Sequence, residues 1–432
     1  MNSQNPVTRL ENAICTSHKK TAAGVFISIT ASSARDEAQK ASERLKTDTQ
    51  LGPLDGCLVA IKANIDLVDI ENTAGSIAFS SAPAKCDAEL VKRLRSAGAV
   101  ILGHTNMSEF AFSGLGLNPH FGNPINPLSS DTPLIPGGSS SGSATAVSLG
   151  IADVAIGTDT SGSIRIPAAF QGLVGYRPSM GRYSIDGVFP LAKSLDTPGS
   201  LSKTVNQIIA LDDILANNPI PKTINISELT FVAPTPDFIR EADNQIQIWF
   251  EEAIEYLEMN GAKIERRDLK VLSRTQDLFA QHGTLVAVEA RKVISKYVDI
   301  NRAPIDSRIR SRLESTSTVS SDDINTLYDS KKTLCEEARN ELSEAVFLMP
   351  TTPNQPPSLA EVSDNLDFSF INAYTMSYTM LLAYLDMPTI ALPIYPKKPG
   401  ASLSIVCRQG EDDKALAIAQ QIEKIFTLNA KV

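Results

Sequence analysis

Two serine-rich turns and one lysine are the residues of this chain whose types and spacing could do chemistry. The turns are PGGSSSGSATA, residues 136–146, and TDTSGSIRIP, residues 158–167, while Lys62 ends the apolar stretch LVAIK. A serine becomes a nucleophile when a base takes its proton, and the chain holds only four histidines. A lysine amine whose charge is disfavoured by burial is an alternative base, because Ser–Lys pairs replace Ser–His–Asp in some hydrolases. The pattern therefore favours serine chemistry that does without histidine.

Other interpretations of the first turn and of the lysine stay open at this point. Residues 137–142 have the glycine spacing of a phosphate-binding P-loop, but the lysine that reaches the phosphates is missing after them. The elbow pattern G-x-S-x-G is also present, centred on Ser140. An elbow needs a strand that leads directly into the turn, whereas Pro133 and Pro136 interrupt the approach. The non-catalytic interpretations are a flexible turn before a helix and, for Lys62, a charge at a sheet edge.

Strands and helices that alternate along the chain would position these residues. Leu58–Ile61 is predicted as a buried strand that ends at Lys62, and Ala152–Ile156 as a strand that leads towards the second turn. Ser143–Gly150 is predicted as a helix of small residues between the two turns. Asp87–Ala97 has the apolar spacing of a helix and is followed by the strand-like AVILG. This alternation is typical of an α/β protein with parallel neighbouring strands.

The second half of the chain has a different texture. Amphipathic helices are predicted after about residue 202, including Glu241–Asn260, Thr275–Tyr297 and Ser321–Leu342. Apolar, strand-like pieces then return as VFLMPTTP, PTIALPI and SLSIVC, before a last helix over Asp412–Phe426. We therefore expect both ends of the chain to contribute to one sheet.

Composition excludes several classes of protein. The 432 residues carry a net charge of −9, which argues against nucleic-acid binding because counterion release needs clustered cations. The five cysteines are far apart and lack metal-ligand spacing, so reduced thiols in the cytoplasm are expected. Met376–Tyr395 is apolar but interrupted by Asp386 and two prolines, which favours a buried helix followed by a strand over a membrane span. The N-terminus lacks the pattern of a secretory signal.

From about residue 25 to 426 the chain resembles the amidase signature family. Its lysine segment is similar to GPLDGCLVAIKANID, and its Gly/Ser-rich signature to LIPGGSSSGSATAVSLGIADVAIGTDTSGSIRIPAAFQGLVGYRPSMGR. LMPTTP and MPTIALPI resemble its C-terminal strands. The resemblance implies an α/β/α sandwich, in which a large twisted mixed sheet is flanked by helices. It also implies an amidohydrolase that forms an acyl-enzyme and uses neither cofactor nor metal.

The resemblance assigns a role to each residue that matches the family's motifs. Lys62 would be the base, Ser139 a bridging serine preceded by a cis peptide bond, and Ser163 the nucleophile. The oxyanion hole would consist of backbone N–H groups of Thr160, Ser161, Gly162 and Ser163. Residues expected to support the two turns are Gly137, Gly138, Asp159 and Arg165. Side chains expected to line the substrate cleft, although a core position fits them equally well, are Met107, Phe110 and Phe112.

The same resemblance implies one domain over residues 1–432. Its parts would be a helical start of about 50 residues, the signature core to about 204, a variable helical part over 205–340 that shapes the cleft, and completing strands and a helix over 341–432. A small amide is the expected partner, with aryl acetamides, malonamate-like compounds and biuret or allophanate as candidates. No nucleic-acid or membrane partner is expected, and family precedent favours a homodimer.

Two residues depart from the family's usual pattern. Ala63 follows Lys62 where Asp is common, and Ser161 stands in a usual Gly-Gly pair before the nucleophile. Neither change removes a member of the expected triad, although both fall beside it. Two alternatives therefore stay open: the glutaminase-type subunit of a tRNA-dependent amidotransferase, and a non-catalytic binding protein on the same scaffold.

Overall fold

One mixed sheet runs through the molecule in the computed structural model, which describes residues 4–79, 81–216 and 224–429. Its eleven strands lie in the order β1-β3-β2-β4-β6-β5-β10-β11-β9-β7-β8. The strands are β1 Phe26–Ile29, β2 Leu58–Lys62, β3 Val100–Thr105, β4 Val154–Asp159, β5 Val174–Arg177, β6 Thr197–Ser202, β7 Thr230–Ala233, β8 Lys263–Arg266, β9 Val346–Pro350, β10 Thr389–Pro393 and β11 Ser402–Val406. The C-terminal strands continue the sheet begun by the N-terminal ones, which confirms that both ends of the chain build it.

The site depends on the parallel part of the sheet. β2 pairs in parallel with β3 on one side and with β4 on the other, while β4 pairs antiparallel with β6. Val59 and Ile61 of β2 belong to one core cluster, whereas Leu58 and Ala60 belong to another. Because successive side chains of a strand point to opposite faces, β2 is covered on both sides, as expected for a parallel strand. Because both faces of β2 are covered, its last residue, Lys62, lies in the interior of the protein.

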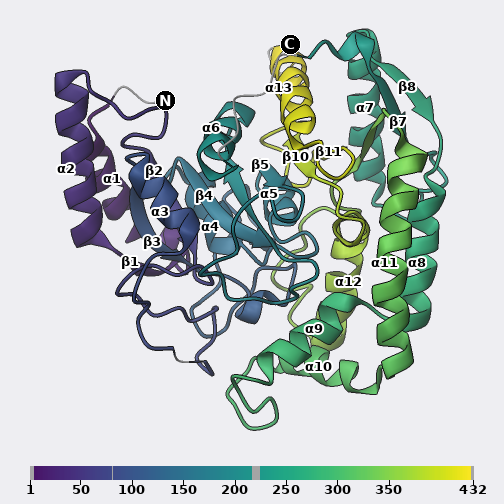
Figure 1. The fold of residues 1–432 in the computed structure, drawn as a ribbon, viewed down its shortest axis with the longest axis horizontal. Helices are drawn as coiled ribbons and strands as arrows, with labels where there is room; N and C mark the ends of the chain where they lie inside the picture. The colour runs from purple at the N-terminus through teal and green to yellow at the C-terminus, as the bar shows by residue number, and fades with distance from the viewer. Residues whose placement is uncertain (1–3, 80, 217–223, 430–432) are drawn as a thin grey trace.

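Helices cover both faces of the sheet. The core clusters place α1, α2, α4 and α5 on one face and α3, α6, α7 and α13 on the other. Figure 1 shows α1 and α2 at one end of the sheet and α8 and α11 at the other. The helices are α1 Pro6–Ser17, α2 Ala31–Thr47, α3 Glu89–Ser96, α4 Ser141–Ser148, α5 Arg165–Phe170, α6 Val205–Ala216, α7 Asn244–Met259, α8 Lys270–His282, α9 Leu285–Ile294, α10 Ser307–Ser315, α11 Ser321–Leu342, α12 Asn365–Tyr384 and α13 Asp412–Asn429. This confirms the α/β architecture.

The segment between residues 205 and 340 differs in two ways from its prediction. It contributes β7 and β8 to the sheet, although only helices were expected there. The single helix predicted over Thr275–Tyr297 is wrong, because α8 ends at His282 and α9 begins at Leu285. The break falls at Gly283, whose φ of +79° is outside the helical range. α8 and α9 nevertheless both pack against α11.

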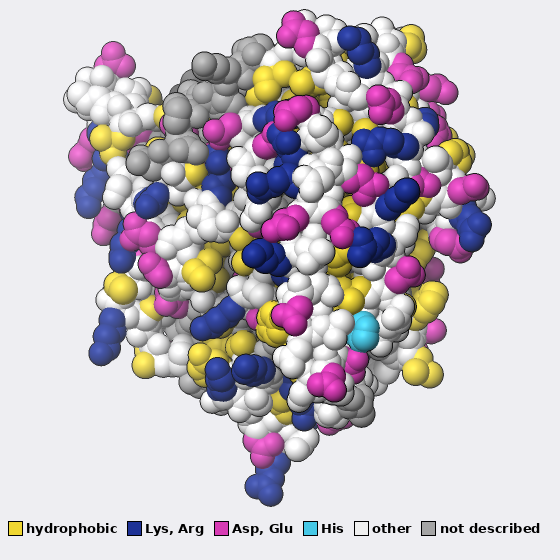
Figure 2. Space-filling view, turned by 45° about the vertical axis from the view of Figure 1, so that its right-hand side comes forward, with side chains coloured by type: hydrophobic (Ala, Val, Ile, Leu, Met, Phe, Trp, Pro, Cys, Tyr) yellow, Lys and Arg dark blue, Asp and Glu magenta, His cyan; other side chains and the backbone are white. Residues whose placement is uncertain are grey.

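The apolar stretch Met376–Tyr395 is the end of α12 followed by β10, as its interruptions predicted. Within the described residues, every helix is too short or too polar to cross a membrane. On the face drawn in Figure 2, Lys and Arg side chains are interspersed with Asp and Glu side chains. Among the described residues, the side chains on that face form no large field of one sign.

Candidate active site

The carboxyl ends of β2 and β4 meet at one edge of the sheet. The two strands are adjacent and parallel, with Ile61 beside Ile156, so the segments that follow them lie together. Lys62 ends β2 and is fully buried, and Thr158 lies near the end of β4. Ligand sites of α/β sheets commonly form outside the carboxyl ends of parallel strands.

The Lys62 amine contacts the first serine turn. Its Nζ lies 2.7 Å from Ser139 Oγ, 2.8 Å from Thr158 Oγ1 and 3.4 Å from the Thr158 carbonyl oxygen. Burial lowers the pKa of Lys62 to about 7, against the opposing effect of the Asp159 and Asp196 carboxylates. A lysine of this kind is partly neutral near pH 7 and is therefore able to accept a proton.

The first turn enters this edge from a tightly packed loop. The peptide bond between Gly138 and Ser139 is cis. A Cβ at Gly137 would lie 2.9 Å from Pro167 Cα, and one at Gly138 would lie 2.5 Å from the Gly116 backbone nitrogen. The Gly138 N–H donates to the Gly114 carbonyl at 2.8 Å. Both glycines are therefore required by the close approach of neighbouring backbone.

The second turn is tied to the first through the backbone. Ser163 lies between β4 and α5, and its carbonyl accepts the Ser140 N–H at 3.2 Å. The Ser163 side chain keeps a small exposed fraction of 6%, whereas Ser139 and Ser140 are fully buried. Within the described residues, no hydrogen bond joins the Ser139 and Ser163 hydroxyls. The structure thus brings Lys62 and Ser139 into contact and places Ser163 on the adjoining turn.

The backbone N–H groups before Ser163 are only partly free. The Gly162 N–H donates to Asp159 Oδ1 at 2.7 Å, so its expected place in an oxyanion hole is corrected. Within the described part of the chain, the N–H groups of Thr160, Ser161 and Ser163 have no acceptor. Gly162 has a φ of +128°, and a Cβ there would overlap the Thr379 hydroxyl. Three donors therefore remain available on this turn.

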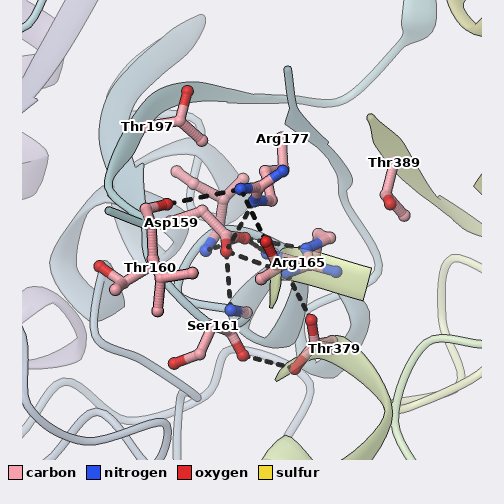
Figure 3. A network of polar contacts seen from close by, with 12 residues as sticks. Asp159, Thr160, Ser161, Arg165, Arg177, Thr197, Thr379 and Thr389 are labelled. Atoms are coloured by element: carbon pink, nitrogen blue, oxygen red, sulfur yellow. Dashed lines mark hydrogen bonds and ion pairs between the residues drawn. The ribbon is translucent and has the colours of Figure 1, made fainter. Parts of the chain in front are cut away.

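Asp159 holds the second turn through a buried network (Figure 3). Its carboxylate accepts Arg165 Nε at 2.9 Å and Nη2 at 3.0 Å, and lies 3.8 Å from Arg177 Nε. Arg165 also donates to the Thr379 carbonyl at 2.9 Å, and the Thr379 hydroxyl donates to the Ser161 carbonyl at 2.7 Å. Burial raises the pKa of Asp159, but the two guanidinium groups outweigh it and hold that pKa at about 2. Asp159 and Arg165 therefore hold the turn through these contacts.

Replacing Asp159 by asparagine is expected to destabilise the fold. Arg165 would lose its carboxylate partner and Arg177 would keep only Asp386, and breaking a buried pair in this way costs about 3 to 5 kcal/mol. Denaturant unfolding followed by circular dichroism measures the change, and Asp131→Asn, which alters an exposed carboxylate, is the control. Because the Asp159 pKa lies below its ordinary value of 3.8, the stabilisation is complete above that pH and is lost as the pH falls through about 2. An Asp159→Asn protein as stable as the parent would contradict this assignment.

The two departures from the family pattern leave the contacts of Lys62 in place. Ala63 lies in the apolar core, and its backbone N–H donates to the Thr105 carbonyl at 3.1 Å. Asn64 supplies the next polar group, because its Nδ2 donates to Thr158 Oγ1 at 3.1 Å. Ser161 is 4% exposed, so its hydroxyl is almost enclosed.

The expected cleft residues pack in the interior. Met107, Phe110 and Phe112 are at most 2% exposed and belong to the main core cluster, so the structure places them in the core rather than on an open cleft. Apolar side chains at this spacing are expected both in a core and in a substrate cleft, which is why the sequence did not decide between the two locations. A cavity of about 310 Å³ instead adjoins the site at Thr158 and Asp196.

One cation on the segment that leads to the first serine turn was missed by sequence reasoning. Arg312 of α10 lies over the Phe112 ring, 4.0 Å from its centroid, and its Nη1 donates to the Phe112 carbonyl. Burial lowers the pKa of Arg312 to about 10. Among the described residues, no carboxylate lies within 4 Å of it. Gly114, two residues after Phe112, is bonded to the turn that carries Ser139. Arg312 therefore places against Phe112 a guanidinium that has no carboxylate partner among the described residues.

A buried lysine in contact with a serine, beside a second serine turn with free N–H donors, defines a class of α/β protein that pairs serine with lysine rather than histidine. Side chains of His, Cys, Asp and Glu in the described ranges form no group of three suited to a metal ion. Comparison with known proteins identifies the family within this class. The sequence profile of the Amidase family matches residues 9–416. The chain belongs to the amidase family and is a hydrolase that acts on amide C–N bonds.

Individual relatives agree with this membership. The chain is 31% identical over 370 residues to 2-amino-5-chloromuconic acid deaminase of Comamonas testosteroni, an alignment that covers 84% of this chain and 79% of the relative. It is 30% identical over 448 residues to one subunit of the glutamyl-tRNA(Gln) amidotransferase of Alkaliphilus metalliredigens, with 92% and 88% covered. A crystal structure of an amidase superimposes with a TM-score of 0.86 and 29% identity, over 98% of this chain and 96% of that one.

Proposed function

We propose that this chain hydrolyses a small amide that carries a carboxylate, and that Lys62, Ser139 and Ser163 perform the reaction. The observation that carries the catalytic part is the 2.7 Å contact between Lys62 Nζ and Ser139 Oγ at a buried site. The observation that carries the substrate class is the guanidinium of Arg312, which lacks a carboxylate partner among the described residues.

The first half of the reaction forms an acyl-enzyme. The Ser163 oxygen attacks the amide carbon, its proton passes to Ser139 Oγ, and the Ser139 proton passes to Lys62 Nζ. The carbonyl oxygen becomes an oxyanion, for which the free N–H groups of Thr160, Ser161 and Ser163 are donors. Collapse breaks the C–N bond while the proton returns through Ser139 to the leaving nitrogen. An ester at Ser163 and ammonia or an amine result.

The second half uses the same groups in reverse. Water replaces the amine, Lys62 takes its proton through Ser139, and the hydroxyl oxygen attacks the ester carbon. The ester C–O bond breaks and Ser163 recovers its proton. A carboxylic acid is released, which loses its proton to the solvent to become a carboxylate, and the lysine returns to its neutral state.

Arg312 narrows the substrate class. A planar guanidinium is suited to binding a carboxylate with two parallel hydrogen bonds. Malonamate-like and allophanate-like compounds carry such a group beside the amide, whereas a simple aryl acetamide does not. The relative from Comamonas testosteroni is likewise named for an acid substrate. These observations support an anionic amide over a neutral one.

Replacing Arg312 by glutamine is expected to raise KM for malonamate by about tenfold to a hundredfold, since a hydrogen bond between charged groups contributes about 1.5 to 3 kcal/mol. The effect on malonamide, which is neutral and of similar size, should be far smaller. Ammonia release measures both. Arg302→Gln is the matched control, because Arg302 is an exposed arginine on the same stretch of chain. Equal losses with the two substrates would contradict carboxylate recognition.

An ammonia-release screen separates this function from its alternative. The screen covers malonamate, allophanate, biuret, indoleacetamide and glutamine with the purified chain alone. Turnover of glutamine only in the presence of partner proteins would favour a tRNA-dependent amidotransferase, a function named for the relative from Alkaliphilus metalliredigens.

A cytoplasmic location agrees with the free cysteines Cys15, Cys57, Cys86, Cys335 and Cys407. The homodimer stays a prediction that rests on the family resemblance.

A further inference from the structure

Asp196 lies beside the site without belonging to the triad. It directly precedes β6 and borders the cavity that also reaches Thr158. Its carboxylate accepts the Thr160 hydroxyl at 2.6 Å and the N–H groups of Leu191 and Ala192 at 2.8 and 3.0 Å. All three donors are neutral. Among the residues that the structure describes, no Lys, Arg or His lies within 4 Å of this carboxylate.

The partners of Asp196 belong to the segment that carries the chemistry. Thr160 begins the turn whose free N–H groups precede Ser163, and its hydroxyl is held by Asp196. Thr158, two residues earlier, binds Lys62 Nζ through its own hydroxyl at 2.8 Å. Asp196 therefore holds the turn that faces the oxyanion and shares a cavity with Thr158, the residue that binds the amine that takes up the proton.

The balance of charge around Lys62 sets Asp196 apart from Asp159. These are the two carboxylates whose charges act on the Lys62 amine. Asp159 is already compensated by Arg165 and Arg177. Among the described residues Asp196 has no cation within 4 Å, and Lys193, which lines the same cavity, lies beyond that distance. When Lys62 becomes an ammonium ion in a buried site, the uncompensated carboxylate is the one whose attraction is not cancelled.

We propose that Asp196 is the counter-ion of protonated Lys62 and that, through the Thr160 hydroxyl, it holds the oxyanion turn in position. It acts on the reaction without touching the reacting atoms, so it is a positioning residue. The inference rests on the proposed function, in which Lys62 accepts the proton of Ser163 through Ser139. It adds a group that stabilises the charge formed in that step.

The proposal has a defined effect on the pH dependence. The charges of Asp159 and Asp196 both raise the pKa of Lys62 against the effect of burial. Glu289 acts on Asp196, and burial together with that negative charge raises the pKa of Asp196 to about 6. Removing the Asp196 charge therefore lowers the pKa of Lys62 further. The resting lysine becomes neutral at lower pH, while the protonated intermediate loses stabilisation.

The test is Asp196→Asn, which keeps the size and an acceptor oxygen but removes the charge. The acid limb of the kcat/KM profile should move to lower pH, and kcat at its plateau should fall about tenfold or more. Asp186→Asn, which removes an exposed carboxylate from the rim of the same cavity, should leave both unchanged. An acid limb that stays in place in a folded Asp196→Asn protein would overturn the proposal.

A measurement without turnover separates this inference from the proposed function. In the Ser163→Ala background, the ¹³Cε signal of Lys62, assigned by its loss in Lys62→Met, reports the lysine titration directly. Asp196→Asn should shift that titration to lower pH even if Ser163 proved not to be the nucleophile, and an unshifted titration would overturn the counter-ion role. Should the asparagine variant fail to fold, Asp196→Ser gives the same readout, with the same two outcomes.

Discussion

Replacing Ser163 by alanine should reduce amide hydrolysis by roughly 10⁴- to 10⁶-fold, because the acyl-enzyme can no longer form. Labelling by a fluorophosphonate probe, which traps an activated serine, should be lost in the same variant. The small exposed fraction of Ser163 and its position on a turn with free N–H donors carry this expectation. The alanine removes only a hydroxyl, so the fold should be retained.

Ser140→Ala is the matched control for that experiment. Ser140 is the serine that an elbow pattern would make the nucleophile, yet it is fully buried and its hydroxyl donates to the Thr158 carbonyl at 3.4 Å. Labelling and turnover should both persist in this variant. Loss of labelling in Ser140→Ala with retention in Ser163→Ala would reverse the assignment. A parent protein that fails to label at all would favour a binding protein on the same scaffold.

The positions of the lysine and the two turns could be predicted because they depend on local signals. A continuous apolar run predicts a strand buried on both faces, and the residue that follows the run then lies at the carboxyl end of that strand. Lys62 follows this rule. The glycines at 137 and 138 and the serine turn after β4 are likewise short patterns. Because β2 and β4 are parallel neighbours, their carboxyl ends lie together, so motifs that follow the two strands can be expected to meet.

The electrostatic surroundings of the site could not be predicted in the same way. Asp196 is 36 residues from Thr160, its hydrogen-bond partner, so nothing near it in the sequence distinguishes it from a surface aspartate. Arg312 lies in α10 among other charged residues, where a solvated helix face is the ordinary interpretation. Phe112, which it covers, was expected in the cleft and lies in the core. Such pairings depend on the packing of segments far apart in the chain.

Charge in this site is arranged so that, among the residues the structure describes, no carboxylate lies within 4 Å of the base. The nearest donors and acceptors of Lys62 are hydroxyls and a carbonyl, while Asp159 is engaged by two arginines. A directly paired lysine would stay protonated near neutral pH and could not take a proton from serine. Lys62 is thus buried, and the groups in direct contact with its amine carry no negative charge. The acidic group that balances it lies one layer further out, at Asp196.

Replacing Lys62 by alanine should lower kcat/KM by about 10²- to 10⁴-fold, the usual contribution of a positioned base. Lys62→Arg should lose as much, because a guanidinium keeps the positive charge but does not release its proton in this pH range. If Lys62 acted only as a fixed charge, the arginine variant would recover much of the activity. Circular dichroism and the thermal midpoint establish that each variant is folded.

The pH profile of the parent enzyme tests the same base without a mutation. Burial holds the pKa of Lys62 at about 7 instead of its ordinary 10.5, and the base works only when neutral. kcat/KM should therefore rise with pH through about 7 and level off above it, since below that value the amine is already protonated. The slope should approach one because a single proton is lost. A profile still climbing tenfold per pH unit at pH 9 would mean that Lys62 keeps its ordinary pKa, and that another group starts the reaction.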